Sequence, residues 1–191
     1  INKLVNLAKK NNMPALAITD NNNMFGVFEF AQECVKNNIQ PIIGTSINLL
    51  DIKTNAKISQ LSFLVKNEIG YKNLLHLTSI SHTSKDNLTG IYLKDLKNYC
   101  AGLYCILGGE HNPLLFLHND NKNNLIDSFI ESLLELFDKN LLFELQRISE
   151  DFLDNFEINL INLANKYNIS LIGSNNVKFK NKDDYSAHDA L

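Results

Sequence analysis

The chain has 191 residues, of which 45% are hydrophobic and 20% charged, and its formal net charge is −3. Such a chain is typical of one domain with a sizeable core, and the lack of any run of about 18 apolar residues excludes a membrane span. The acidic balance and the single arginine, Arg147, argue against strong direct DNA binding by this segment.

Helices and strands alternate in the first part of the chain. Apolar residues at helical spacing predict a helix from Ile1 to Ala8, and an apolar run predicts a strand over 15–18. A second strand is predicted at 41–44. Between the two strands lies a second predicted helix face, formed by Val27, Phe28, Ala31, Cys34 and Val35. This order predicts a parallel sheet covered by helices.

The rest of the chain continues the alternation less regularly. Further strands are predicted at 61–65, 103–107, 141–145 and 170–173. Further helices are predicted around 71–78, 125–137 and 152–167, and polar loops at 51–59 and 81–89. Nothing separates two domains, so we expect a single domain over 1–191. The alternation is typical of a closed barrel or an open doubly wound sheet.

Polar residues stand where the predicted strands end, which is where both of these folds place their active sites. The candidate metal ligands there are Asp20, Glu110, His111 and Glu144, spread over three strands. A catalytic metal site needs about three protein ligands drawn from His, Asp, Glu or Cys. These strand ends are therefore polar but poor in metal ligands.

A series of motifs resembles a known family. The stretch LVNLAKKNNMPALAITDNNNMFGVFEFAQECVKNNIQPIIGT is followed in order by NEIGYKNLLHL, GLYCILGGE, FELQR, LIGSNNVKF and AHDAL. This series is similar to the PHP (polymerase and histidinol phosphatase) domain at the amino end of the bacterial DNA polymerase III alpha subunit, over essentially the whole chain. The resemblance implies an α/β fold, a distorted (β/α)7 barrel of the PHP type, lacking its first strand because that strand would precede Ile1.

The resemblance also implies that the family's metal site is degenerate here. The five ligand positions that can be aligned hold Asn21, Ser46, Gly109, Asn176 and Lys178. Amide and hydroxyl groups are weak neutral ligands, glycine has no side chain, and the ammonium of Lys178 would repel a divalent cation. We therefore expect neither a bound metal nor a catalytic residue in this segment.

The asparagines that follow Asp20 then have a structural interpretation. Asn21 fills a vacated ligand position, and Asn22 or Asn23 is expected to cap a helix that starts near Met24. An ordinary strand-to-helix turn with a capping asparagine is the alternative interpretation of the same stretch.

Three further motif residues are expected at the barrel mouth. Asp20 would accept hydrogen bonds in a polar network there, with Lys178 as a candidate partner. Glu144 and Arg147, from the FELQR motif, are expected to form a buried or rim ion pair.

For function, the resemblance implies a non-catalytic scaffold within a replicative DNA polymerase, a nucleotidyltransferase that uses Mg²⁺ bound elsewhere. The expected partners are the rest of that polymerase subunit and a separate proofreading exonuclease subunit, with DNA reached through the parent protein. One alternative is an active metal-dependent phosphoesterase or 3′–5′ exonuclease. Another is a stand-alone barrel with a small-molecule pocket.

The three cysteines and the chain ends bear on the setting of the protein. Cys34, Cys100 and Cys105 contain no CxxC pair, which argues against a disulfide framework and indicates a reducing cytoplasm. No signal peptide is visible. Because the chain lacks an initiator methionine and begins inside a helical pattern, we expect it to be a piece of a longer protein.

Overall fold

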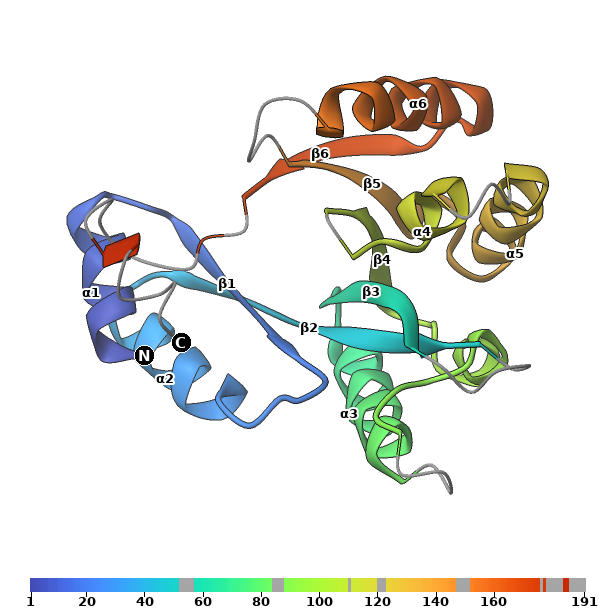
Figure 1. Ribbon diagram of the computed structural model, residues 1–191. Helices are drawn as coiled ribbons and strands as arrows, with labels where there is room; N and C mark the ends of the chain where they lie inside the picture. Colours follow the sequence, from blue (N-terminus) through green and yellow to red (C-terminus); the bar gives the residue numbers. More distant parts are fainter. Residues whose placement is uncertain are drawn as a thin grey trace.

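The computed structural model describes residues 1–51, 57–83, 88–109, 111–119, 123–146, 152–175, 177 and 184–185 (Figure 1). The first elements in chain order are α1 (Asn2–Lys10), β1 (Ala15–Asn21), α2 (Val27–Lys36), β2 (Gln40–Leu50), β3 (Lys57–Val65) and α3 (Glu68–His82). The later elements are β4 (Leu103–Gly108), α4 (Pro113–Asn119), α5 (Ile126–Phe137), β5 (Leu141–Gln146), α6 (Phe152–Tyr167) and β6 (Ser170–Ser174), with short 3₁₀ turns before β4 and on either side of α5.

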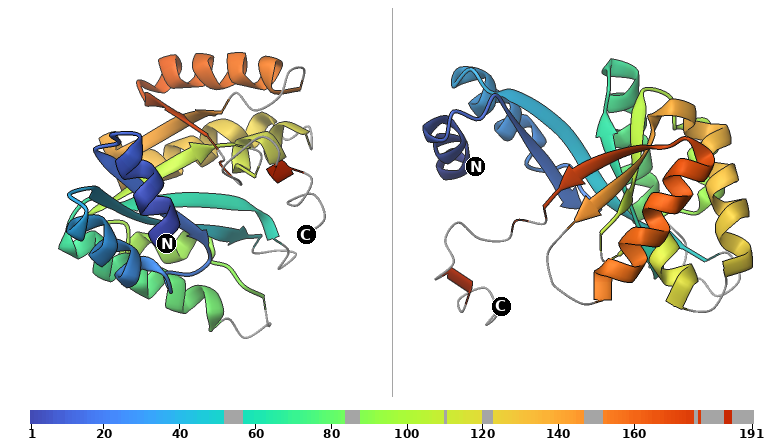
Figure 2. Two further views of the ribbon diagram at one scale, coloured as in Figure 1. Left: turned by 90° about the vertical axis from the view of Figure 1, so that its left-hand side faces the viewer. Right: turned by 90° about the horizontal axis from the view of Figure 1, so that it is seen from above.

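The strands form one sheet in the order β1-β2-β3-β4-β5-β6, which curls into a half-barrel with β1 and β6 at its edges (Figures 1 and 2). This confirms the predicted α/β fold. The helices cover the convex face of the curl, and the concave face carries none of the described helices (Figure 2). The concave face is therefore where a barrel of this kind would hold its site.

One strand runs against the direction predicted from the alternation. β3 pairs antiparallel with both β2 and β4, whereas the β1–β2, β4–β5 and β5–β6 pairs are parallel. The cause is the connection after β2, which returns directly as a hairpin without the crossover that a parallel pair needs. β2 also continues to Leu50, so Gly44 and Ser46, taken as a strand end, lie in mid-strand.

The core lies between the sheet and its helices in two clusters. The large cluster includes Ile47, Phe63, Leu74, Leu107 and Phe143, all fully buried. A smaller cluster beneath α1 and α2 consists of Val5, Ala8, Phe30, Cys34 and Ile39. No helix of the described part of the chain is both long and apolar enough to span a bilayer.

The predicted buried face of α2 is partly wrong. Val27 and Cys34 are buried as expected, but Phe30 replaces Phe28 and Val35, which are 71% and 65% exposed. The helix carries apolar residues on two faces, so its periodicity alone does not identify the side that packs on the sheet.

Candidate functional site

The candidate site is the polar end of the concave face. Residues paired in register on neighbouring strands point to the same side of a sheet, and successive residues alternate. The polar residues on the concave side include Asn21, Ser46, Asn48, Gln60, Ser62, Glu144, Gln146 and Ser174 at one end, and Thr19, Gln40 and Ser170 nearer the amino ends of the parallel strands. The apolar residues of the same face include Ile42, Leu64, Tyr104, Ile106, Leu142 and Ile172, of which Ile172 lies level with Glu144 and Ile106 level with Ser62. The face thus has a mainly apolar floor and a polar mouth.

Neutral side chains of β2 and β3 are hydrogen-bonded to one another at their part of the mouth. The hydroxyls of Ser46 and Ser62 are hydrogen-bonded at 2.8 Å, and Gln60 Nε2 donates to Asn48 Oδ1 at 3.0 Å. Asn21 pairs in register with Ser46. A hydroxyl bound to another hydroxyl is a poor partner for a cation, so this pair suits a closed polar ladder better than a metal site.

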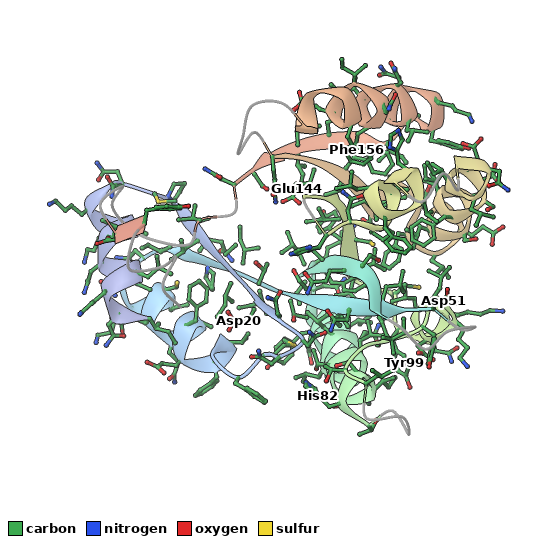
Figure 3. All side chains as sticks on the ribbon, viewed as in Figure 1. Asp20, Asp51, His82, Tyr99, Glu144 and Phe156 are labelled. Carbon is green, nitrogen blue, oxygen red and sulfur yellow. The ribbon has the colours of Figure 1, made fainter. Side chains whose placement is uncertain are left out.

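At the β4–β5 part of the mouth, the Gln146 side chain lies against Gly109. Gly109 has a φ of +68°, and a Cβ added there would lie 2.9 Å from Gln146 Oε1. Gln146 Nε2 in turn donates to the Ser174 hydroxyl at 3.4 Å, and that hydroxyl donates to Glu144 Oε1. The Glu144 carboxylate therefore accepts a hydrogen bond that joins β6 to β5 at the mouth (Figure 3).

The remaining predicted mouth residues lie outside the described part of the chain. These are Arg147, Asn176 and Lys178, together with the candidate ligand Glu110. His111 is exposed, and its carbonyl accepts a hydrogen bond from the Gln60 N–H at 2.7 Å. Within the described residues, no group of three His, Cys, Asp or Glu side chains gathers where it could hold a metal.

Asp20 lies on the opposite face of the sheet from Asn21. Its Oδ2 is 3.8 Å from where a Cβ on Gly26 would stand, at the N-terminus of α2 (Figure 3). Its carbonyl accepts a hydrogen bond from the Thr45 hydroxyl at 2.7 Å. This differs from the expected role in a mouth network, because side chains alternate along a strand and adjacent residues cannot share a face. Beside Gly26, the negatively charged Asp20 carboxylate lies near the positive end of the α2 helix dipole.

Asn22 ties the loop after β1 to two other elements. Its N–H donates to the Ser46 carbonyl at 2.8 Å, and its Oδ1 accepts from the Asn48 N–H at 2.8 Å. Its carbonyl lies 2.6 Å from His82 Nε2, which must be the donor because a carbonyl only accepts. His82, expected in a polar loop, is the last residue of α3. The φ of +55° at Asn22 suits asparagine, which tolerates the left-handed region.

Asn23 completes the loop. Its Oδ1 accepts from the Phe25 N–H at 3.2 Å, and its Nδ2 donates to the Asn21 carbonyl at 3.0 Å. α2 begins at Val27 with Gly26 as its N-cap and no side-chain cap. The predicted capping role of Asn22 or Asn23 is therefore wrong, because Asn22 bonds to β2 and α3, and Asn23 bonds within the turn that precedes the helix.

One structural residue of the mouth escaped the sequence analysis. Asn112 is 1% exposed, donates to the Gly109 carbonyl at 2.6 Å and accepts from the Leu115 N–H at 3.0 Å. It thereby fixes the backbone of Gly109 and starts α4, an element that was not predicted. The signal was present, since asparagine followed by Pro113 is a helix start with proline in the first turn.

Comparison with known proteins finds similar sequences over essentially the whole chain. Residues 1–148 match the family model described as PHP domain. The DNA polymerase III subunit alpha of Rickettsia bellii (strain RML369-C) is 36% identical over 196 residues, covering 99% of this chain and 16% of that protein. The corresponding subunit of Borreliella burgdorferi is 32% identical over 210 residues, covering 100% and 17%. The chain thus spans about a sixth of these curated relatives.

The solved structures support the fold. A candidate metal-dependent phosphoesterase from Bifidobacterium adolescentis aligns with a TM-score of 0.55 and 12% sequence identity, covering 91% of this chain and 80% of that one. At this identity the likeness concerns architecture alone.

Proposed function

The chain belongs to the PHP domain family, and from that premise we propose that it is a non-catalytic PHP scaffold within a bacterial DNA polymerase III alpha subunit. The observation that carries the proposal is the state of the mouth. Ser46 is hydrogen-bonded to Ser62, and Gln146 occupies the space that a side chain at position 109 would need. Positions that the family uses for ligands instead hold neutral groups engaged with one another.

The parent protein would transfer deoxynucleotides to a primer end in the cytoplasm, with Mg²⁺ held outside this segment. The segment itself would need no cofactor and would contribute little direct DNA binding, consistent with its net charge of −3. Its partners would be the rest of the alpha subunit and a separate proofreading exonuclease. An exposed apolar patch with a polar rim, rather than the mouth, would serve such docking.

The first experiment tests catalysis. We expect the complete domain to bind no stoichiometric Zn, Mn or Fe and to hydrolyse no phosphoester, because a metal-bound water becomes a nucleophile only if the cation is held. Elemental analysis and a 3′–5′ degradation assay in a polymerase-inactive background measure this. Asn21→His alone should restore nothing, since one ligand falls short of about three.

Stoichiometric metal, or chelator-sensitive hydrolysis lost in Glu144→Ala, would overturn the scaffold proposal in favour of an active phosphoesterase or exonuclease. The second experiment tests docking by pull-down of the full alpha subunit with its cognate exonuclease. Absence of a complex at micromolar concentration would remove the docking role and leave the metal result unaffected.

A further inference from the structure

The smaller hydrophobic cluster belongs to a unit of its own at the N-terminal end of the described chain. It lies beneath α1 and α2, which pack mainly on each other, on β1 and on β2. Figure 1 shows these elements on one side of the molecule, away from α4, α5 and α6. We call residues 1–43, which comprise α1, β1, α2 and the start of β2, the wing, and the remaining described residues the body.

β2 joins the wing to the body. Its residues 40–46 pair with β1, and its residues 44–50 pair with β3. The two pairings therefore share only Gly44, Thr45 and Ser46. Because the hydrogen-bond ladder passes from the wing to the body through so short a segment, β1 can separate from β2 while the β2–β3 ladder stays intact.

The wing is also held by much less core than the body. The smaller cluster contains five buried residues and the larger cluster 23, counted over the described part of the chain. α1 has 9 residues and α2 has 10. Isolated helices shorter than about 12–15 residues are marginal in water. Both helices therefore depend on the smaller cluster, so that opening of this cluster should unfold α1, β1 and α2 together.

The loop after β1 ties the wing to the body at a further place. The Nε2 of His82, the last residue of α3, donates to the Asn22 carbonyl at 2.6 Å (Figure 3). Met24, from the same loop, is partly buried against the larger cluster. Both contacts must break when the wing leaves the body, so they oppose its opening.

We propose that the wing is a separately opening unit of the fold, latched to the body by His82. The consequence lies at the mouth of the concave face. Asn21, at the end of β1, pairs in register with Ser46 of the mouth, so β1 forms the wall of the mouth on that side. Opening of the wing removes this wall and uncovers the edge of β2. The inference concerns the fold and does not rest on the proposed function.

Two native cysteines report on the two parts separately. Cys34 lies in the smaller cluster and Cys105 in the larger, and both are fully buried. The experiment measures the labelling of each thiol by iodoacetamide in the full-length protein, below the urea concentration of global unfolding. Mass spectrometry of the peptides that contain the two cysteines gives the rates. A Cys100→Ser background removes the contribution of the half-buried third thiol.

We expect Cys34 to be labelled at least about tenfold faster than Cys105, because a buried thiol reacts only in an open state and the wing opens more often than the body. Its labelling should also accelerate with urea, with a smaller slope than that of Cys105, since the slope scales with the surface exposed. Equal rates and slopes at the two cysteines would show that only global unfolding occurs and would overturn the proposal. Faster labelling of Cys34 without urea dependence would also overturn it, because that result indicates fraying at the end of α2 alone.

The latch is tested by His82→Ala, with His76→Ala as the matched control. His76 lies on the same helix but stacks on Tyr99, with the ring centroids 5.2 Å apart. His82→Ala should speed the labelling of Cys34 about fivefold, roughly the contribution of one hydrogen bond, and should leave Cys105 unchanged. Equal effects of the two substitutions on Cys34, or an equal effect of His82→Ala on both cysteines, would overturn the assignment of His82 as the latch.

Discussion

Gly109 illustrates how backbone conformation and packing together can determine the residue at one position. Its φ of +68° lies in the left-handed region, and an added Cβ would meet the Gln146 side chain at 2.9–3.1 Å. A ligand side chain there would need both a backbone change and the displacement of Gln146. Backbone conformation and local packing thus both favour glycine at this position.

We therefore predict that Gly109→Ala lowers the free energy of unfolding by about 1–2 kcal/mol, from left-handed backbone strain plus crowding. Urea denaturation of the domain measures it. Gly173→Ala is the matched control, since a Cβ there meets nothing within 4 Å, and it should change stability far less. Gln146→Ala should relieve only the crowding part of the loss in a double variant, and equal losses at positions 109 and 173 would contradict this account.

At the scale of elements, a polar cluster joins α5 to α6. Lys166 Nζ donates to both carboxylate oxygens of Asp127 at 2.8 and 2.9 Å, and the Tyr167 hydroxyl donates to Asp127 Oδ1 at 2.8 Å. Hydrogen bonds from Lys166 and Tyr167 hold the pKa of Asp127 below its usual value, and the bond to Asp127 raises the pKa of Lys166. The cluster thus links α5 to α6 at the surface of the protein.

A pH dependence follows. The pKa of Asp127 is lower in the folded protein than in the unfolded chain, where it is about 3.9. The ionised carboxylate therefore stabilises the fold fully above the unfolded-state pKa, and this stabilisation is lost as the pH falls through the folded-state pKa. Asp127→Asn should therefore destabilise the protein at pH 7, and the difference should shrink below about pH 4. Urea denaturation at pH 7 and pH 3 measures it.

Glu131→Gln on the same helix is the control, since Glu131 is exposed and α5 also carries it. It should have little effect at either pH. A difference between wild type and Asp127→Asn that is constant from pH 7 to pH 3 would show that the ionised carboxylate is not the source of the stabilisation.

At the scale of the whole molecule, the open sheet is the dominant feature. β1 and β6 are the edges of the described sheet, and an unpaired edge offers free backbone groups for association with other chains. We predict that the isolated 191 residues are marginally stable and associate with rising concentration. Extension of the chain upstream, to include the strand that the family places there, should raise the melting temperature.

Light scattering over a concentration series and reversible thermal melts measure both effects. A sharp, reversible, two-state melt of the isolated chain, unchanged by the extension, would contradict the prediction. The exposed Phe28 side chain adds to the same tendency, so Phe28→Ser should lessen association without altering the sheet edges.

The sequence by itself determined where most of the helices and strands lie, because the spacing of apolar residues differs between the two. It also determined which side chains stand at positions 21, 46 and 109, which no fold can alter.

Other features depend on residues that are distant in the sequence. A short apolar run carries no direction, so the antiparallel course of β3 emerged only from its pairing. α2 has two apolar faces, and only contact with the sheet decided which is buried. Strand register decides the face on which Asp20 lies, the pairing of Ser46 with Ser62 and the nearness of Gln146 to Gly109. The reason is that side chains alternate along a strand, and only the neighbouring strands determine which set faces the concave side.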